Sequence, residues 1–89
     1  MRIKKNFVLR RITEAWVILP LAEETVNFAG MLNLNETGAM LWKLLEKGAD
    51  RDTLVQALTS EYAVSTEQAQ EDVEEYLNKL FKAGVLLEN

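Results

Sequence analysis

Within Gly30-Met31-Leu32-Asn33-Leu34-Asn35-Glu36-Thr37-Gly38-Ala39-Met40-Leu41-Trp42, an alternating strand-like segment changes into a strongly apolar helix. The strand is expected over residues 28–34, with Gly30 as a bend or bulge. Asn35 then fits a helix N-cap, because its side chain can accept a hydrogen bond from a free amide of the first turn. Residues before this junction predict strands, and residues after it predict helices.

Two further strands are predicted before the junction. Phe7–Ile12 and Ala15–Leu19 are rich in β-forming residues, and Thr13-Glu14 between them fits a two-residue turn. Pro20 ends the second strand because proline has no backbone N–H to donate to a sheet ladder. A polar connection then leads to the strand over residues 28–34.

Three helices are predicted after the junction, each with start and stop signals. The first ends at Gly48, and the second follows the cap Asp50. The third follows Ser65 and stops at Gly84. Ser65 and Gln68 fit a capping box, in which the side chain of each residue bonds to the backbone amide of the other. The apolar positions of the three helices are Ala39, Met40, Leu41, Trp42, Leu44 and Leu45; Leu54, Val55, Leu58 and Tyr62; and Ala69, Val73, Tyr76, Leu77, Leu80 and Phe81.

The order of these elements indicates the fold class. Three short N-terminal antiparallel strands followed by a three-helix bundle predict an α+β fold of the winged helix-turn-helix type. The apolar first helix is expected to be central and buried. Val85-Leu86-Leu87 is expected to dock back on the core. With 89 residues and 48% hydrophobic residues, the chain is expected to be a single globular domain over residues 1–89.

Composition argues against an enzyme. The chain has no cysteine and no histidine, so thiolate chemistry, cysteine zinc sites and the commonest general base are excluded. No catalytic constellation remains, and no metal or cofactor is predicted. The absence of cysteine fits a cytosolic, or cytoplasmic, location. No segment approaches the ~20 apolar residues that span a bilayer.

Charge is unevenly distributed over the chain. The net charge is −4, from 10 basic and 14 acidic residues. A winged helix suggests DNA binding, yet the third helix, which would enter the major groove, opens with acidic residues that phosphates repel. Because of this repulsion, a nucleic-acid-binding or transcription-regulatory module is kept as the alternative interpretation and not as the leading one. The basic residues of the N-terminal segment are Arg2, Lys4, Lys5, Arg10 and Arg11, and the acidic residues from position 61 to 76 are Glu61, Glu67, Glu71, Asp72, Glu74 and Glu75.

An open sheet edge favours peptide binding instead. The strand over residues 28–34 is expected at an edge, where its free amides and carbonyls can pair with a guest strand. The third helix would form the second wall of that groove. Most of its apolar stripe is core, while Asp72, Glu75, Tyr76 and Lys79 lie at the margin and can face a guest. Dimerisation through the same strand, giving a homodimer, is the other interpretation of the open edge.

These features together resemble one known family. The sequence is similar to the PqqD family, the coenzyme PQQ synthesis protein D family, whose members are also called RiPP precursor peptide recognition elements. The resemblance covers nearly the whole chain. It is carried by the strand ending in Pro20, the stretch Gly30–Trp42, Leu54-Val55-x-x-Leu58 with Tyr62, and the acidic third helix closing on Lys82-Ala83-Gly84-Val85-Leu86.

The resemblance implies a function. Members are small non-enzymatic chaperones with a winged-helix-like fold that bind the leader segment of a ribosomally made precursor peptide. The leader adds as a strand to the third β-strand, against the third helix, and is delivered to a modifying enzyme, often a radical SAM protein. Members of the family serve the biosynthesis of PQQ, lasso peptides, sactipeptides and other products, so the resemblance implies PQQ biosynthesis as one of several pathways in which the chain could act. The peptide-binding residues implied here are Phe28, Gly30, Met31, Leu32, Asn33 and Leu34, and Asp72, Glu75, Tyr76 and Lys79.

Overall fold

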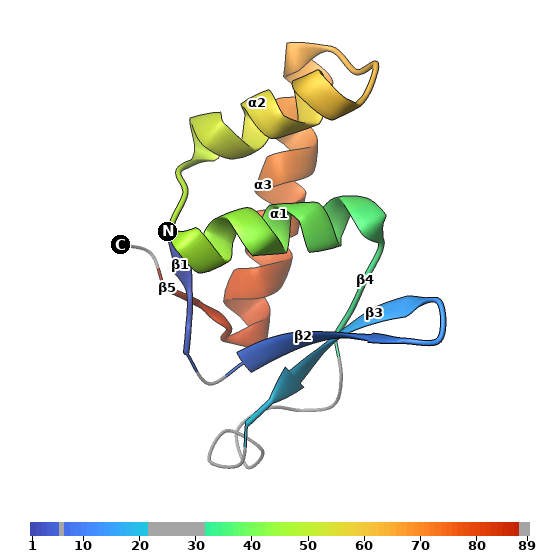
Figure 1. Ribbon diagram of the computed structural model, residues 1–89. Coiled ribbons are helices and arrows are strands. Elements are labelled where there is room, and N and C mark those ends of the chain that lie inside the picture. The colour runs from blue at the N-terminus through green and yellow to red at the C-terminus, as the bar shows by residue number, and fades with distance from the viewer. Residues whose placement is uncertain (6, 22–31, 88–89) are drawn as a thin grey trace.

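The strands of the chain lie beneath and beside a layer of helices (Figure 1). The computed structural model describes residues 1–5, 7–21 and 32–87. The α+β order predicted from the sequence is confirmed. Over the described residues the elements are β1 (Arg2–Ile3), β2 (Phe7–Ile12), β3 (Ala15–Pro20), β4 (Leu32–Leu34), α1 (Glu36–Lys47), α2 (Arg51–Glu61), α3 (Thr66–Ala83) and β5 (Leu86–Leu87).

The main sheet is antiparallel, with the strand order β2-β3-β4. Thr13 and Glu14 form the predicted turn between β2 and β3, and Thr13 takes a φ of 60°. Among the described strands, the predicted edge position of the strand after the connection is confirmed, because β4 is the last strand in this order. β4 begins at Leu32, and the predicted strand residues 28–31 lie outside the described residues.

A second strand pair joins the two ends of the described chain and was not predicted. β1 and β5 are antiparallel, with Arg2 opposite Leu87 and Ile3 opposite Leu86. The Lys4 amide extends this pairing by donating to the carbonyl oxygen of Val85 at 2.9 Å. The C-terminal segment docks on the core as expected, since Val85 and Leu86 are buried, although Leu87 is 43% exposed.

Each helix begins at the predicted cap. Asp50 accepts hydrogen bonds from both the amide and the hydroxyl of Thr53, and these bonds hold the pKa of its carboxyl below its usual range. The serine half of the predicted capping box forms, while the Gln68 side chain donates to Asp72 Oδ1 at 2.9 Å. The cap bonds run from the amides of Gly38, Thr53 and Gln68 to the side chains of Asn35, Asp50 and Ser65.

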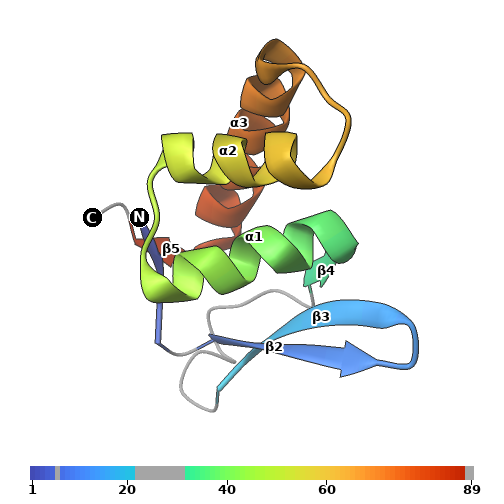
Figure 2. The same ribbon diagram turned by 45° about the horizontal axis from the view of Figure 1, so that its top comes forward.

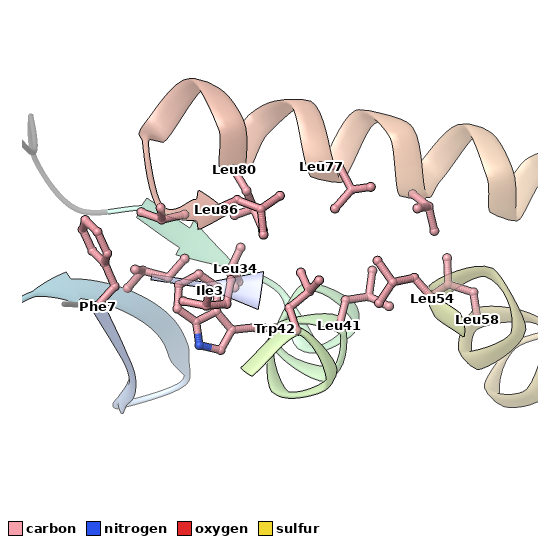
Figure 3. Packing of buried hydrophobic residues seen from close by; sticks show 14 of the residues in the cluster. Ile3, Phe7, Leu34, Leu41, Trp42, Leu54, Leu58, Leu77, Leu80 and Leu86 are labelled. Atoms are coloured by element: carbon pink, nitrogen blue, oxygen red, sulfur yellow. The ribbon is translucent and has the colours of Figure 1, made fainter. Parts of the chain in front are cut away.

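The core lies between α3 on one side and α1 and α2 on the other. α3 crosses behind α1 and α2 in both views (Figures 1 and 2), and Leu77 and Leu80 of α3 point toward Leu41, Trp42 and Leu54 (Figure 3). Trp42 is fully buried, so the predicted central position of α1 is confirmed. The helical stripe assigned to α2 is wrong at its last position: Tyr62 is 40% exposed, because α2 ends at Glu61 and the backbone is extended from Tyr62 onward.

Candidate functional site: a groove between β4 and α3

Asn33 turns its backbone groups away from the neighbouring strand β3. Its carbonyl oxygen accepts a hydrogen bond from Lys79 Nζ of α3 at 3.2 Å. The N–H and C=O of one strand residue point to the same side, so the pair of Asn33 with Val17 is a non-hydrogen-bonded one. The Asn33 amide therefore also faces α3.

The register of the hairpin supports the same assignment independently. Ile12 and Ala15 flank the two-residue turn, so they form a hydrogen-bonded pair. Bonding then alternates along β3, which turns the backbone groups of Val17 toward β2 rather than toward β4. In the described residues no strand pairs with the outer side of β4, and Asn33 presents both a donor and an acceptor there.

A groove of about 580 Å³ lies beside this edge. We call it the β4–α3 groove. Its apolar lining consists of leucines from β4, α1 and α2 that also belong to the core, and its polar lining comes mainly from one face of α3. The lining residues are Leu34, Asn35, Thr37, Gly38, Leu41, Leu58, Asp72, Glu75, Tyr76 and Lys79.

A hydrogen bond of Tyr76 connects two elements that line the groove, α3 and the first turn of α1. The tyrosine hydroxyl donates to the carbonyl oxygen of Gly38 at 2.7 Å. Burial raises the pKa of the Tyr76 hydroxyl well above its usual range. Gly38 allows this turn to approach β4 closely, since a Cβ at this position would lie 3.2 Å from Leu34 Cβ.

The charged side chains of the groove are exposed and have no ionic partner among the residues that the structure describes. Lys79 bonds to a backbone oxygen, and Asp72 accepts a hydrogen bond from the neutral amide of Gln68. In the described part of the chain, the ion pairs are Arg11 with Glu36 and Arg51 with Glu74, and neither includes a groove residue. The charges of the groove are thus available to a ligand.

The structure places six of the predicted peptide-binding residues around one groove. Leu34, Asp72, Glu75, Tyr76 and Lys79 line it, and Asn33 touches it through Lys79. Leu32 lies in β4 opposite Ile18. Their binding role stays a prediction. Phe28, Gly30 and Met31 lie outside the described residues.

Sequence reasoning missed part of the lining. Thr37 and Gly38 lie in the first turn of α1, three and four residues after the end of β4, and this closeness in sequence is a signal that was present. Leu41 and Leu58 read as ordinary core positions, because helical periodicity identifies a buried face without showing which part of it another element leaves uncovered. The missed lining residues are Asn35, Thr37, Gly38, Leu41 and Leu58.

The residues that the structure describes contain neither a candidate metal site nor a candidate membrane-spanning helix. No group of three or more acidic, histidine or cysteine side chains there is placed to hold a metal ion. None of the helices described has both the length and the apolar character needed to cross a bilayer.

Comparisons with known proteins match the chain to one family and to solved structures. Residues 15–86, which include every element of the groove, match the family Coenzyme PQQ synthesis protein D (PqqD). The solved structure of TbiB1 in complex with the TbiA(beta) leader peptide is similar with a TM-score of 0.80 and 26% identity, over 100% of this chain and 98% of that one. Lasso peptide synthetase B1 complexed with the leader peptide shares the fold, with a TM-score of 0.77 and 24% identity, over 97% of this chain and 95% of that one. No curated protein matches the chain in sequence.

Proposed function

The chain belongs to the PqqD family, and we propose that it binds the leader segment of a ribosomally synthesised precursor peptide. The leader adds as a strand to the outer edge of β4 and lies in the β4–α3 groove. The domain acts without catalysis and presents the bound peptide to a modifying enzyme such as a radical SAM protein. Because such precursors are made on ribosomes, the proposal places the chain in the cytoplasm.

The outward-facing backbone of Asn33 carries this proposal. A guest strand gains main-chain hydrogen bonds from an open edge, and pockets beside that edge select its side chains. Both parts are present here, since Asn33 faces the groove and Leu34, Leu41 and Leu58 supply apolar lining. The solved structure of TbiB1, to which the chain is similar over its full length, is a complex with a leader peptide, and this supports leader binding by this chain.

Binding of duplex DNA is not favoured by the charges of α3. Glu67, Glu71 and Glu74 are exposed on this helix, which would have to approach the phosphates. Each of these carboxylates would weaken contact with a polyanion, whereas readers of DNA present cationic faces.

A matched pair of proline variants tests strand addition. Random twelve-residue peptides displayed on phage are selected on the full chain, and a selected peptide is synthesised. Its Kd is measured with the wild type, with Asn33→Pro and with Arg11→Pro. Arg11 is the control, because the register also turns its backbone outward, but on the other outer strand, β2. Proline is tolerated where the missing N–H pointed away from the sheet, so both variants should fold.

Asn33→Pro is expected to weaken peptide binding roughly tenfold or more, because it removes one hydrogen bond and places a ring against the guest. Arg11→Pro is expected to leave Kd within about twofold, since no bond to the guest is lost. Thermal melts followed by circular dichroism verify that both variants are folded. If folded Asn33→Pro binds as tightly as the wild type, or if selection enriches no peptide, the proposed function is wrong.

A further inference from the structure

The β4–α3 groove carries opposite charges at its two ends. Asp72, Glu75, Tyr76 and Lys79 follow one another at spacings of three, one and three residues, so they share one face of α3. With a rise of ~1.5 Å per residue, Asp72 and Glu75 precede Lys79 along the helix axis by roughly 10 and 6 Å. Acidic side chains therefore line the first part of the groove, and an ammonium group lies at the other end.

Neither end is neutralised by the described part of the chain. Glu75 lies four residues before Lys79, which is the spacing at which glutamate and lysine commonly pair on a helix. The Lys79 ammonium instead reaches across to the carbonyl oxygen of Asn33. This leaves a separated pair of charges along the path of a guest strand.

The contacts across the groove fix the relative direction of its walls. β4 contacts Lys79 at Asn33 and continues into α1, where the carbonyl oxygen of Gly38 accepts from Tyr76. The chain of β4 therefore passes α3 in the opposite sense. Every described strand pairing is antiparallel, and antiparallel pairing is the slightly more stable type. A guest antiparallel to β4 enters at Asp72 and leaves at Lys79.

We propose that the groove selects leader segments in which a basic residue precedes an acidic residue by two or four positions, so that both side chains lie on the same face of the guest strand. This proposal rests on the proposed leader binding. The spacing follows from the separation of roughly 6–10 Å and the rise of ~3.4 Å per strand residue, with allowance for side-chain length. The basic residue meets Asp72 and Glu75, and the acidic residue meets Lys79.

The guest itself makes the lysine available. Its backbone N–H bonds to the carbonyl oxygen of Asn33, which Lys79 now holds at 3.2 Å. The displaced ammonium then pairs with the guest carboxylate. Apolar guest residues on the same face of the strand as the two charges cover Leu34, Leu41 and Leu58. A uniformly acidic strand is repelled by Asp72 and Glu75, and a uniformly basic one is repelled by Lys79.

Peptide selection on a charge-reversed chain tests this order. Random twelve-residue peptides on phage are selected on the wild type and on the full chain carrying Asp72→Lys, Glu75→Lys and Lys79→Glu together. All three side chains are exposed, so the variant should fold. The wild type is expected to enrich basic-before-acidic peptides, and the variant is expected to enrich the reverse order. Glu71→Lys, which changes the net charge equally outside the groove lining, is the control and should enrich the wild-type order.

Synthetic peptides then give the size of the effect. An enriched peptide and a twin with its basic and acidic residues exchanged are compared by Kd on the wild type. The twin is expected to bind roughly tenfold more weakly at low salt, with the gap narrowing in 0.5 M salt because exposed charges are screened. Equal Kd values for the twins, or one charge order on both chains, would overturn the inference.

Asn33→Pro separates this inference from the proposed function. If the selected peptides bind Asn33→Pro more weakly than the wild type but show no preferred order of basic and acidic residues, only the charge selection is overturned, and strand addition stands. Peptides that bind Asn33→Pro and the wild type equally overturn strand addition, and the charge selection with it.

Discussion

The two outer strands of the main sheet, β4 and β2, differ in what lies beside them. Asn33 of β4 and Arg11 of β2 both turn their backbone groups away from β3. β4 faces α3 across the β4–α3 groove, whereas β2 contributes none of the residues that line it. The turn-proximal half of β2 is exposed, and its two arginines oppose pairing with another strand. An open backbone edge becomes a specific binding site when a second wall supplies pockets for side chains.

The largest expected difference between the two edges is in the free energy of unfolding, when one apolar residue on each strand is truncated to alanine. Leu34 of β4 is buried, so Leu34→Ala is expected to lower the free energy of unfolding by about 2–5 kcal/mol through lost packing and the cavity left behind. Ile12 of β2 is 49% exposed, and Ile12→Ala should change it by less than about 0.5 kcal/mol. Urea denaturation measures both. Equal losses would show that the β4 edge is no more integrated into the core than the β2 edge.

The bond that joins the groove walls should have a smaller effect on stability. Tyr76→Phe removes the hydrogen bond to the Gly38 carbonyl and is expected to cost about 0.5–1.5 kcal/mol near neutral pH. Tyr62→Phe is the control, since Tyr62 is exposed, and should cost almost nothing. Urea denaturation at pH 7 makes the comparison. Equal costs would mean that the bond does not hold the walls together.

The same tyrosine should make stability depend on pH. The folded pKa of Tyr76 is raised, while the unfolded value is about 10. Below pH ~10 both states keep the proton, and above it the unfolded state loses the proton first, so the free energy of unfolding falls as pH rises. Comparing denaturation at pH 9 and pH 11 should show a smaller fall for Tyr76→Phe than for the wild type. An equal fall would contradict the burial of this hydroxyl.

Relieving the backbone strain at Thr13, in the turn between β2 and β3, should raise the stability of the fold without changing peptide binding in the groove. Thr13 has a φ of 60°, which is unfavourable for a β-branched residue. Thr13→Gly is expected to stabilise the fold by about 0.5–1 kcal/mol, after the entropic cost of glycine is subtracted. Glu14→Gly should give no gain, because Glu14 does not share the positive φ. Thermal unfolding measures stability, and a change in peptide Kd for Thr13→Gly would show that the two edges are coupled.

Local rules predicted the parts of this fold that local chemistry specifies. Asn35, Asp50 and Ser65 each begin a helix because a single side chain accepts from an amide three residues ahead. The pair of β1 with β5 could not be predicted in this way. Its strands have two residues each and lie at opposite ends of the described chain, so neither shows a period.

The candidate site shows the same limit. The alternation at 31–34 identified a strand but did not say whether the backbone groups of Asn33 or those of Leu32 and Leu34 would face outward. That choice depends on the register with β3 and on the reach of Lys79 to Asn33, 46 positions away in sequence. The margin of α3 was predictable from its period of 3.6, whereas the leucines that complete the groove depend on how α1, α2 and α3 cross.

The smallest predicted effect concerns Lys79, whose ammonium bonds to the proposed binding edge at Asn33. Lys79→Met frees the carbonyl oxygen of Asn33. A selected peptide with its charged residues replaced by threonine should therefore bind this variant up to about twofold more tightly than the wild type, because no ammonium has to be displaced. The parent peptide should bind it more weakly, since its carboxylate loses a partner. Calorimetric Kd values test this crossing of preferences, with Lys82→Met, an exposed lysine in the last turn of α3, as the control. Weaker binding of the neutral peptide by Lys79→Met would contradict the competition. If the two peptides show these opposite preferences, cationic side chains lie along both outer strands, and the cation beside β4 is one that a guest peptide can displace.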